Sequence, residues 1–109
     1  MNWIAIIAAL SGAMAVGAGA FGAHGVSGQP AGWLKTGAHY QLIHAVAALV
    51  ALKMAARGPA WLFLAGGGLF AVTLYLMALG APRWFGAITP IGGAALIAGW
   101  LWLAWSARG

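Results

Sequence analysis

Four apolar runs constrain the fold of this sequence more than any other feature. They cover residues 3–21, 37–56, 61–79 and 87–105, and each is roughly 20 residues long. A helix of about 20 residues rises about 30 Å, which is the thickness of the hydrocarbon core of a bilayer. The runs are continuous and show no sustained alternation, so they predict helices rather than barrel strands.

The composition leaves lipid as the main solvent of the chain. Charged residues make up 5% of it and hydrophobic residues 64%, and it contains no Asp or Glu. In a soluble domain about a quarter of the residues are charged. This chain has too few charged residues to form a surface that faces water. We therefore predict an all-α membrane protein, with four transmembrane helices in a compact bundle and one domain over residues 1–109.

The net charge of +5 comes from cations near the ends of the apolar runs rather than from a cluster. This placement is typical of charges that flank membrane spans, and it argues against a nucleic-acid partner. The lipid bilayer is the expected partner. With four spans both termini share one side, together with Lys53, Arg57 and Arg108, whereas Lys35 and Arg83 lie opposite. The bias favours a bacterial cytoplasmic (inner) membrane protein with cytoplasmic termini.

The residue types that are missing exclude several chemistries. With no Cys, Asp or Glu, the chain has no thiolate ligand, no paired-carboxylate acid and base, and no carboxylate to orient a His base. We therefore assign no catalytic residue, no metal ligand and no cofactor, and expect that the protein is not an enzyme.

Gly and Pro mark the expected breaks between the spans. Residues 25–32 are predicted to form a polar loop, followed by a short interfacial helix at residues 33–35. Residues 57–59 and 80–83 are predicted to form tight connections, because Pro interrupts helices and Gly supplies unusual turn angles. The seven Trp residues fall mostly at run ends and are interpreted as anchors in the membrane interface.

Rows of small residues indicate close helix packing. The first run carries Ala5, Ala9, Ala13 and Gly17 at every fourth position, beside a second row with Ala8, Gly12 and Gly19. Small residues allow helices to approach closely in lipid. The rows can pack within one subunit or between copies, so a homo-oligomer is a companion hypothesis.

The few polar residues near the spans are expected to share one leaflet. They form a candidate polar pocket of His24, Gln41, His44 and Thr89. Gln41 and His44 are three residues apart and share a helical face, whereas His39 points elsewhere. A His this deep in a span should face protein, and the expected partners of His44 are Gln41, His24, Thr89 or a backbone carbonyl freed by Pro90.

Three functions fit this polar set. The first is a structural or accessory protein in which the set clamps the helices through hydrogen bonds. The second is a small transporter or channel subunit for protons, ions or a small solute, with His24, Gln41 and His44 along the route. The third is a haem- or metal-binding protein, since axial haem ligation needs only His.

Several segments in order along nearly the whole chain resemble a known family. They are Gly19-Ala20-Phe21-Gly22-Ala23-His24-Gly25, Tyr40-Gln41-Leu42-Ile43-His44-Ala45, Gly68-Leu69-Phe70, and Ile88-Thr89-Pro90-Ile91-Gly92-Gly93. They resemble the YgdD/YwdK-like small integral membrane proteins, the domain of unknown function 423 family. The resemblance implies several membrane spans and carries over no activity.

Overall fold

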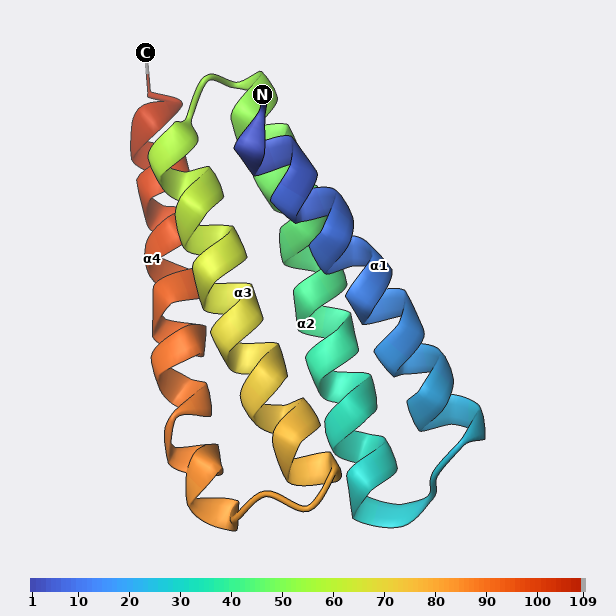
Figure 1. The fold of residues 1–109 in the computed structure, drawn as a ribbon. Coiled ribbons are helices and arrows are strands. Elements are labelled where there is room, and N and C mark those ends of the chain that lie inside the picture. Colours follow the sequence, from blue (N-terminus) through green and yellow to red (C-terminus); the bar gives the residue numbers. More distant parts are fainter. Residues whose placement is uncertain (109) are drawn as a thin grey trace.

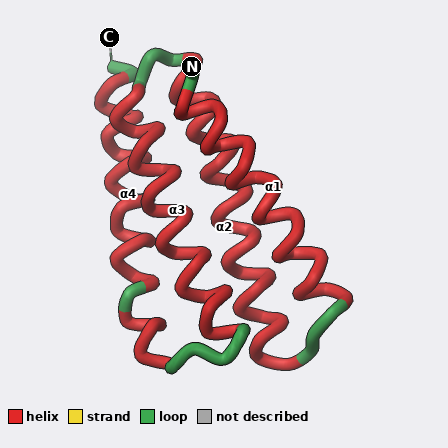
Figure 2. The backbone as a smooth tube through the Cα atoms, in the orientation of Figure 1, coloured by secondary structure: helices red, strands yellow, loops and turns green. Residues whose placement is uncertain are grey.

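The computed structural model describes residues 1–108, so Gly109 of the predicted domain lies outside the described residues. Within that range the chain forms four α-helices and one 3₁₀ helix. They are α1 (Trp3–His24), α2 (Gly28–Lys53), α3 (Arg57–Ala78), η1 (Arg83–Ala87) and α4 (Thr89–Ser106). Short connections join the helices, and the described part of the chain contains no strand (Figures 1 and 2). The prediction of an all-α fold with four helices is confirmed.

The helices lie side by side and run up and down (Figure 1). Each helix packs mainly against its neighbours in the sequence, so α2 and α3 form the middle of the layer and α1 and α4 its two edges. Both described ends of the chain lie at the same end of the bundle. Within the 18-residue apolar stretch of each helix, 56% of the residues are buried in α3 but only 17% in α1. The edge helices are therefore open to lipid.

Three segments are long and apolar enough to cross a membrane: Trp3–His24, Arg57–Ala78 and Arg83–Ser106. The helix α2 is absent from this set although it has 26 residues. Its middle part contains His39, Gln41 and His44, which lower its hydropathy. Because α2 packs between α1 and α3, Gln41 and His44 are buried against protein, whereas His39 is exposed. The predicted division into four spans stays a prediction.

The loop predicted at residues 25–32 is wrong. Only residues 25–27 connect α1 to α2, and Pro30 is the third residue of α2. The first backbone N–H groups of a helix have no partner within it, so Pro is tolerated there. The interfacial helix predicted at residues 33–35 is likewise a continuous part of α2.

The same error recurs at the next connection. Residues 57–59 are the first turn of α3 rather than a loop, and the connection is residues 54–56, where Ala55 has a φ of 59°. The third connection contains Gly80 with a φ of 109°, a conformation that favours Gly. It leads through η1 into α4, which starts at Thr89 with Pro90 in its first turn.

The interior is built from small residues around a few large ones. One cluster surrounds Ile4, Phe63, Leu64 and Leu96, and its other buried members are Ala8, Ala47, Ala48, Ala51, Ala56 and Ala60. The backbones of α3 and α4 approach closely at Gly92, where an added Cβ would lie 2.6 Å from the backbone nitrogen of Phe70. Such contacts hold helices together by close backbone approach, as expected in lipid.

The two small-residue rows of α1 have different surroundings. The row with Ala8, Gly12 and Gly19 faces α2, and a Cβ on Gly19 would lie 3.4 Å from that of Ala38. In the other row, Ala9, Ala13 and Gly17 are exposed, and nothing lies within 4 Å of a Cβ added at Gly17. Packing within the subunit therefore uses one row and leaves the second open.

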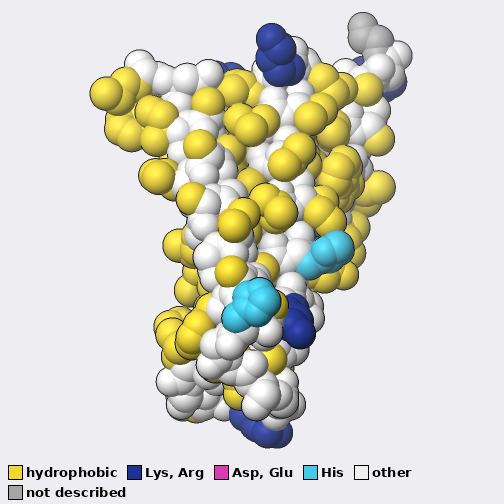
Figure 3. All heavy atoms as spheres, turned by 90° about the vertical axis from the view of Figure 1, so that its right-hand side faces the viewer, with side chains coloured by type: hydrophobic (Ala, Val, Ile, Leu, Met, Phe, Trp, Pro, Cys, Tyr) yellow, Lys and Arg dark blue, Asp and Glu magenta, His cyan; other side chains and the backbone are white. Residues whose placement is uncertain are grey.

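The surface on the α1 side is apolar between charged ends. Figure 3 shows hydrophobic side chains over most of this face, with Lys or Arg toward both ends of the molecule. Two His side chains lie in its lower half. This distribution suits a protein whose middle faces hydrocarbon and whose ends face head groups.

Candidate functional site

Gln41 connects three helices through its side-chain amide. It lies on α2, is 3% exposed, and accepts a hydrogen bond from the Tyr75 hydroxyl of α3 at 2.6 Å. Its amide nitrogen donates to the Ser11 hydroxyl oxygen of α1 at 3.1 Å and lies 3.4 Å from the sulfur of Met14. The amide is thus the shared partner of α1, α2 and α3 in the middle of the layer.

His44 connects α2 to α4. The indole nitrogen of Trp100 donates to Nε2 of His44 at 2.9 Å. An indole N–H can only donate, so Nε2 carries no proton. The Nδ1 atom, 2.6 Å from the Tyr40 carbonyl oxygen, therefore carries the hydrogen and donates it. The ring is a neutral imidazole with both nitrogens engaged by protein.

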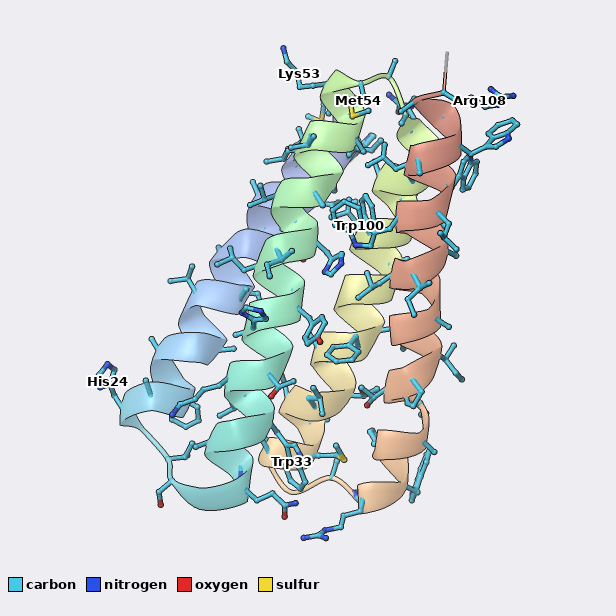
Figure 4. All side chains as sticks on the ribbon, turned by 180° about the vertical axis from the view of Figure 1, so that it is seen from behind. His24, Trp33, Lys53, Met54, Trp100 and Arg108 are labelled. Atoms are coloured by element: carbon cyan, nitrogen blue, oxygen red, sulfur yellow. The ribbon has the colours of Figure 1, made fainter. Side chains whose placement is uncertain are left out.

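Aromatic side chains surround this contact. The His44 ring centroid lies 5.6 Å from that of Phe63 and 5.8 Å from that of Trp100. Phe63 and Trp100 are themselves 4.7 Å apart, at an angle of 51°. These tilted and edge-on contacts are favourable aromatic geometries and limit the rotation of the imidazole. Figure 4 shows Trp100 turned inward from α4 toward α2.

Thr89 joins the start of α4 to α3. Its hydroxyl oxygen lies 2.7 Å from that of Thr73, and both residues are buried. The Thr73 oxygen also lies 3.0 Å from the carbonyl oxygens of Leu69 and Phe70. If Thr73 gives its single hydrogen to one of these carbonyls, Thr89 donates to Thr73. The pair joins two helices without any charge.

The structure does not bring the four predicted pocket residues together. Gln41, His44 and Thr89 are buried but bond to separate partners, and His24 is exposed at the last residue of α1. Figure 4 shows the His24 side chain directed away from the bundle. The predicted partners of His44 are wrong, because Trp100 and the Tyr40 carbonyl oxygen fill that role. His39 is exposed and points elsewhere, as predicted.

Sequence reasoning missed four residues of the network: Ser11, Thr73, Tyr75 and Trp100. The first three were visible as hydroxyl groups inside apolar runs, where an unpaired polar group is costly. Trp100 was interpreted as an interfacial anchor, and this is wrong because its indole bonds to His44. Its position five residues before Trp105, inside the last run, was the available signal.

The buried side-chain nitrogen and oxygen atoms of residues 1–108 all have hydrogen-bond partners within the protein. No group of three metal-ligating side chains is present in that range. With both of its ring nitrogens engaged, His44 would have to give up a contact to bind a haem iron. The network is therefore arranged to join helices to one another.

Helices with apolar outer faces, joined inside by neutral polar contacts, define an integral membrane protein. The chain belongs to the family described as "Protein of unknown function (DUF423)", whose model matches residues 18–93. The match contains His24, Gln41, His44 and Thr89. The family resemblance seen in the sequence is confirmed.

Bacterial relatives resemble the chain over most of its length. The UPF0382 membrane protein YwdK of Bacillus subtilis is 39% identical and covers 93% of this chain and 92% of its own. The UPF0382 inner membrane protein YgdD of Escherichia coli K12 is 40% identical and covers 91% of this chain and 84% of its own. A UPF0382 membrane protein of Staphylococcus haemolyticus is 38% identical over 94% of this chain and 93% of its own. No solved structure matches the chain.

Proposed function

We propose that the protein is a non-catalytic structural or accessory component of the bacterial cytoplasmic membrane, whose polar residues clamp its helices. The observation that carries this proposal is that Gln41 bonds to α1 and α3 and His44 bonds to α4, while the other ring nitrogen of His44 is bonded to the Tyr40 carbonyl oxygen of its own helix. Such bonds are worth about 0.6 kcal/mol each in membrane proteins and fix how the helices meet.

The arrangement favours a clamp over a transport route. A route for protons or ions needs polar groups that follow one another across the membrane. Here His24 is exposed at a helix end, and Gln41 and His44 bond to different helices. The proposal also places both termini in the cytoplasm, supported by Lys53, Arg57 and Arg108 at their end of the bundle.

A pair of His variants on one helix tests the clamp. His44→Ala removes the acceptor of the Trp100 indole and opens a cavity, so the free energy of unfolding in detergent should fall by about 2 kcal/mol. His39→Ala, on the same helix but exposed, should leave it within about 0.5 kcal/mol of the parent protein. Unchanged stability of the His44→Ala variant would contradict the clamp.

Flux measurements test the transporter alternative. Liposomes containing the protein should pass protons and alkali cations no faster than empty liposomes under several gradients. A flux above that background that is lost in the His44→Ala variant, but kept in the His39→Ala variant, would replace the clamp with a conducting role.

Association between copies is part of the proposal. The support is the exposed row of Ala9, Ala13 and Gly17 on α1, whose spacing suits close helix contact. Light scattering of the purified protein gives the test: Ala13→Leu should convert an oligomer to a monomer. A monomeric parent protein would remove this part and leave the clamp intact.

A further inference from the structure

An open groove lies between α2 and α4, with α3 as its floor. Its volume is about 520 Å³, and its lining is mostly apolar and aromatic. We call it the α2–α4 groove, and the residues that matter here are Tyr40, His44, Phe70, Ile97 and Trp100. The volume is in the range of sites that hold small organic molecules, about 300–1,000 Å³.

The groove opens toward the hydrocarbon region. Tyr40 lies halfway along α2, and Ile97 and Trp100 on the opposite wall are 63% and 45% exposed. In a chain of this class the exposed middle of a helix faces acyl chains. An occupant would therefore enter from the lipid phase and be largely apolar.

The Tyr40 hydroxyl is the unusual feature of the groove. The Tyr40 side chain is 42% exposed, and no group of residues 1–108 forms a hydrogen bond with its hydroxyl. A hydroxyl directed at hydrocarbon without a partner costs free energy. Tyr75, the only other Tyr, donates its hydroxyl to Gln41 instead. The wall of the groove thus presents one unused donor.

Ring contacts hold Tyr40 in place. Its ring centroid lies 4.6 Å from that of Phe70, and its ring is parallel to that of His44 at 6.3 Å and 5°. The imidazole nitrogens of His44 are already bonded, so the Tyr40 hydroxyl is the free polar group of this wall. Flat aromatic walls pack well against a flat ring.

We propose that the α2–α4 groove binds a lipid-soluble ring compound bearing a carbonyl group, whose oxygen accepts a hydrogen bond from the Tyr40 hydroxyl. A saturated acyl chain could fill the apolar walls, but it has no acceptor at this depth. A ring carbonyl satisfies the hydroxyl and the aromatic walls together.

A matched pair of probes tests the proposal on the full chain in nanodiscs of saturated phosphatidylcholine. One probe is a long-chain phenyl ketone, and the other is the alkylbenzene of the same chain length, which lacks only the carbonyl. Binding is measured from the rise of the thermal unfolding midpoint with probe concentration, since a ligand of the native state stabilises it. The ketone should bind about fivefold more tightly, as expected for one hydrogen bond.

The two tyrosines provide the matched variants. Tyr40→Phe should abolish the preference for the ketone without lowering the midpoint measured in the absence of probe, because it removes a hydroxyl that has no partner. Tyr75→Phe should lower that midpoint because it breaks the bond to Gln41, yet keep the preference. Ile97→Trp, which fills the groove, should weaken the binding of both probes.

Other occupants give different results. Equal binding of the two probes, or a preference that survives in Tyr40→Phe, would overturn the proposal in favour of an acyl chain. Binding of neither probe would overturn it as well. An unfolding midpoint that depends on the ratio of protein to lipid, and only while Tyr40 is present, would replace the ligand with a second copy of the chain.

Discussion

The two edge helices are attached to the same central pair in different ways. The polar contacts of α1 both converge on Gln41, through Ser11 and Met14. In contrast, α4 is held by two separate polar contacts, Thr89 with Thr73 near its start and Trp100 with His44 farther along. Between these contacts, the backbones of α3 and α4 approach closely at Gly92.

The comparison shows two ways to hold a helix in lipid. On the α1 side one amide serves three helices, so its loss should affect all of them together. On the α4 side the attachment is distributed along the helix, and the close backbone approach at Gly92 leaves no room for a Cβ. The largest effect on the α4 side should therefore come from added volume rather than from a lost hydrogen bond.

The sharpest way to break the α4 side is Gly92→Val. Its Cβ would lie 2.6 Å from the backbone nitrogen of Phe70, which cannot move as a side chain can. The free energy of unfolding should fall by about 3 kcal/mol. Thermal unfolding in detergent measures this, with Gly93→Ala as the control, since a Cβ there would lie 3.8 Å from the Phe70 ring. Equal stability of both variants would show that the close approach is not needed.

On the α1 side, Gln41→Leu removes the shared partner while keeping similar volume. It leaves the buried Tyr75 hydroxyl unpaired, and the free energy of unfolding should fall by about 2 kcal/mol. Adding Tyr75→Phe should restore part of this loss, because the unpaired hydroxyl is then gone. Strictly additive effects in this double-mutant cycle would argue that the two side chains are not coupled.

A smaller effect is expected from Trp100→Phe. The variant keeps an aromatic ring but takes the donor away from Nε2 of His44, so stability should decrease by about 1 kcal/mol. Trp102→Phe is the control, because Trp102 is as exposed as Trp100 and packs against Gly58 of α3 but forms no hydrogen bond within residues 1–108, so it reports the loss of ring area alone. The difference between the two midpoints in one unfolding experiment measures the contact, and equal midpoints would remove it from the clamp.

The smallest effect should come from Thr89→Val. It removes one hydroxyl, while Thr73 keeps the carbonyl oxygens of Leu69 and Phe70 within reach. A loss of about 0.6 kcal/mol is therefore expected. Thr89→Ser, which keeps the hydroxyl, should retain the stability of the parent protein, and a Ser variant as weak as the Val variant would point to packing of the methyl group instead.

The helices and their lipid setting could be predicted from the apolar runs, but the helix starts could not. The starts of α2 and α3 were both predicted too late in the chain, and for the same reason. Pro30 and Pro59 each occupy the third residue of a helix, where the missing N–H costs nothing because that group has no partner inside the helix. A rule that treats Pro as a break moves the start of the helix past it.

The polar residues could be identified from the sequence, but not their pairing. Gln41 and His44 stood out because buried polar groups are rare in spans. Their partners depend on the rotation of each helix about its own axis. Because these helices are rich in small residues, the sequence determines that rotation only weakly. Gln41 bonds to Tyr75 across 34 residues and His44 to Trp100 across 56, and no local pattern encodes those distances along the chain.

The early start of α2 has a mechanical consequence. With 26 residues the helix is about 39 Å long, whereas the hydrocarbon layer is about 30 Å thick. Where α2 crosses the bilayer as predicted, the excess is taken up by tilt or by projection of the helix end into the head groups. At the N-terminal end of α2 the Arg83 guanidinium donates to Gln29 and lies 5.9 Å from the Trp33 ring. These polar contacts anchor the N-terminal end of α2 in the head-group region. The tilt angle of the helix layer should therefore change with the thickness of the bilayer.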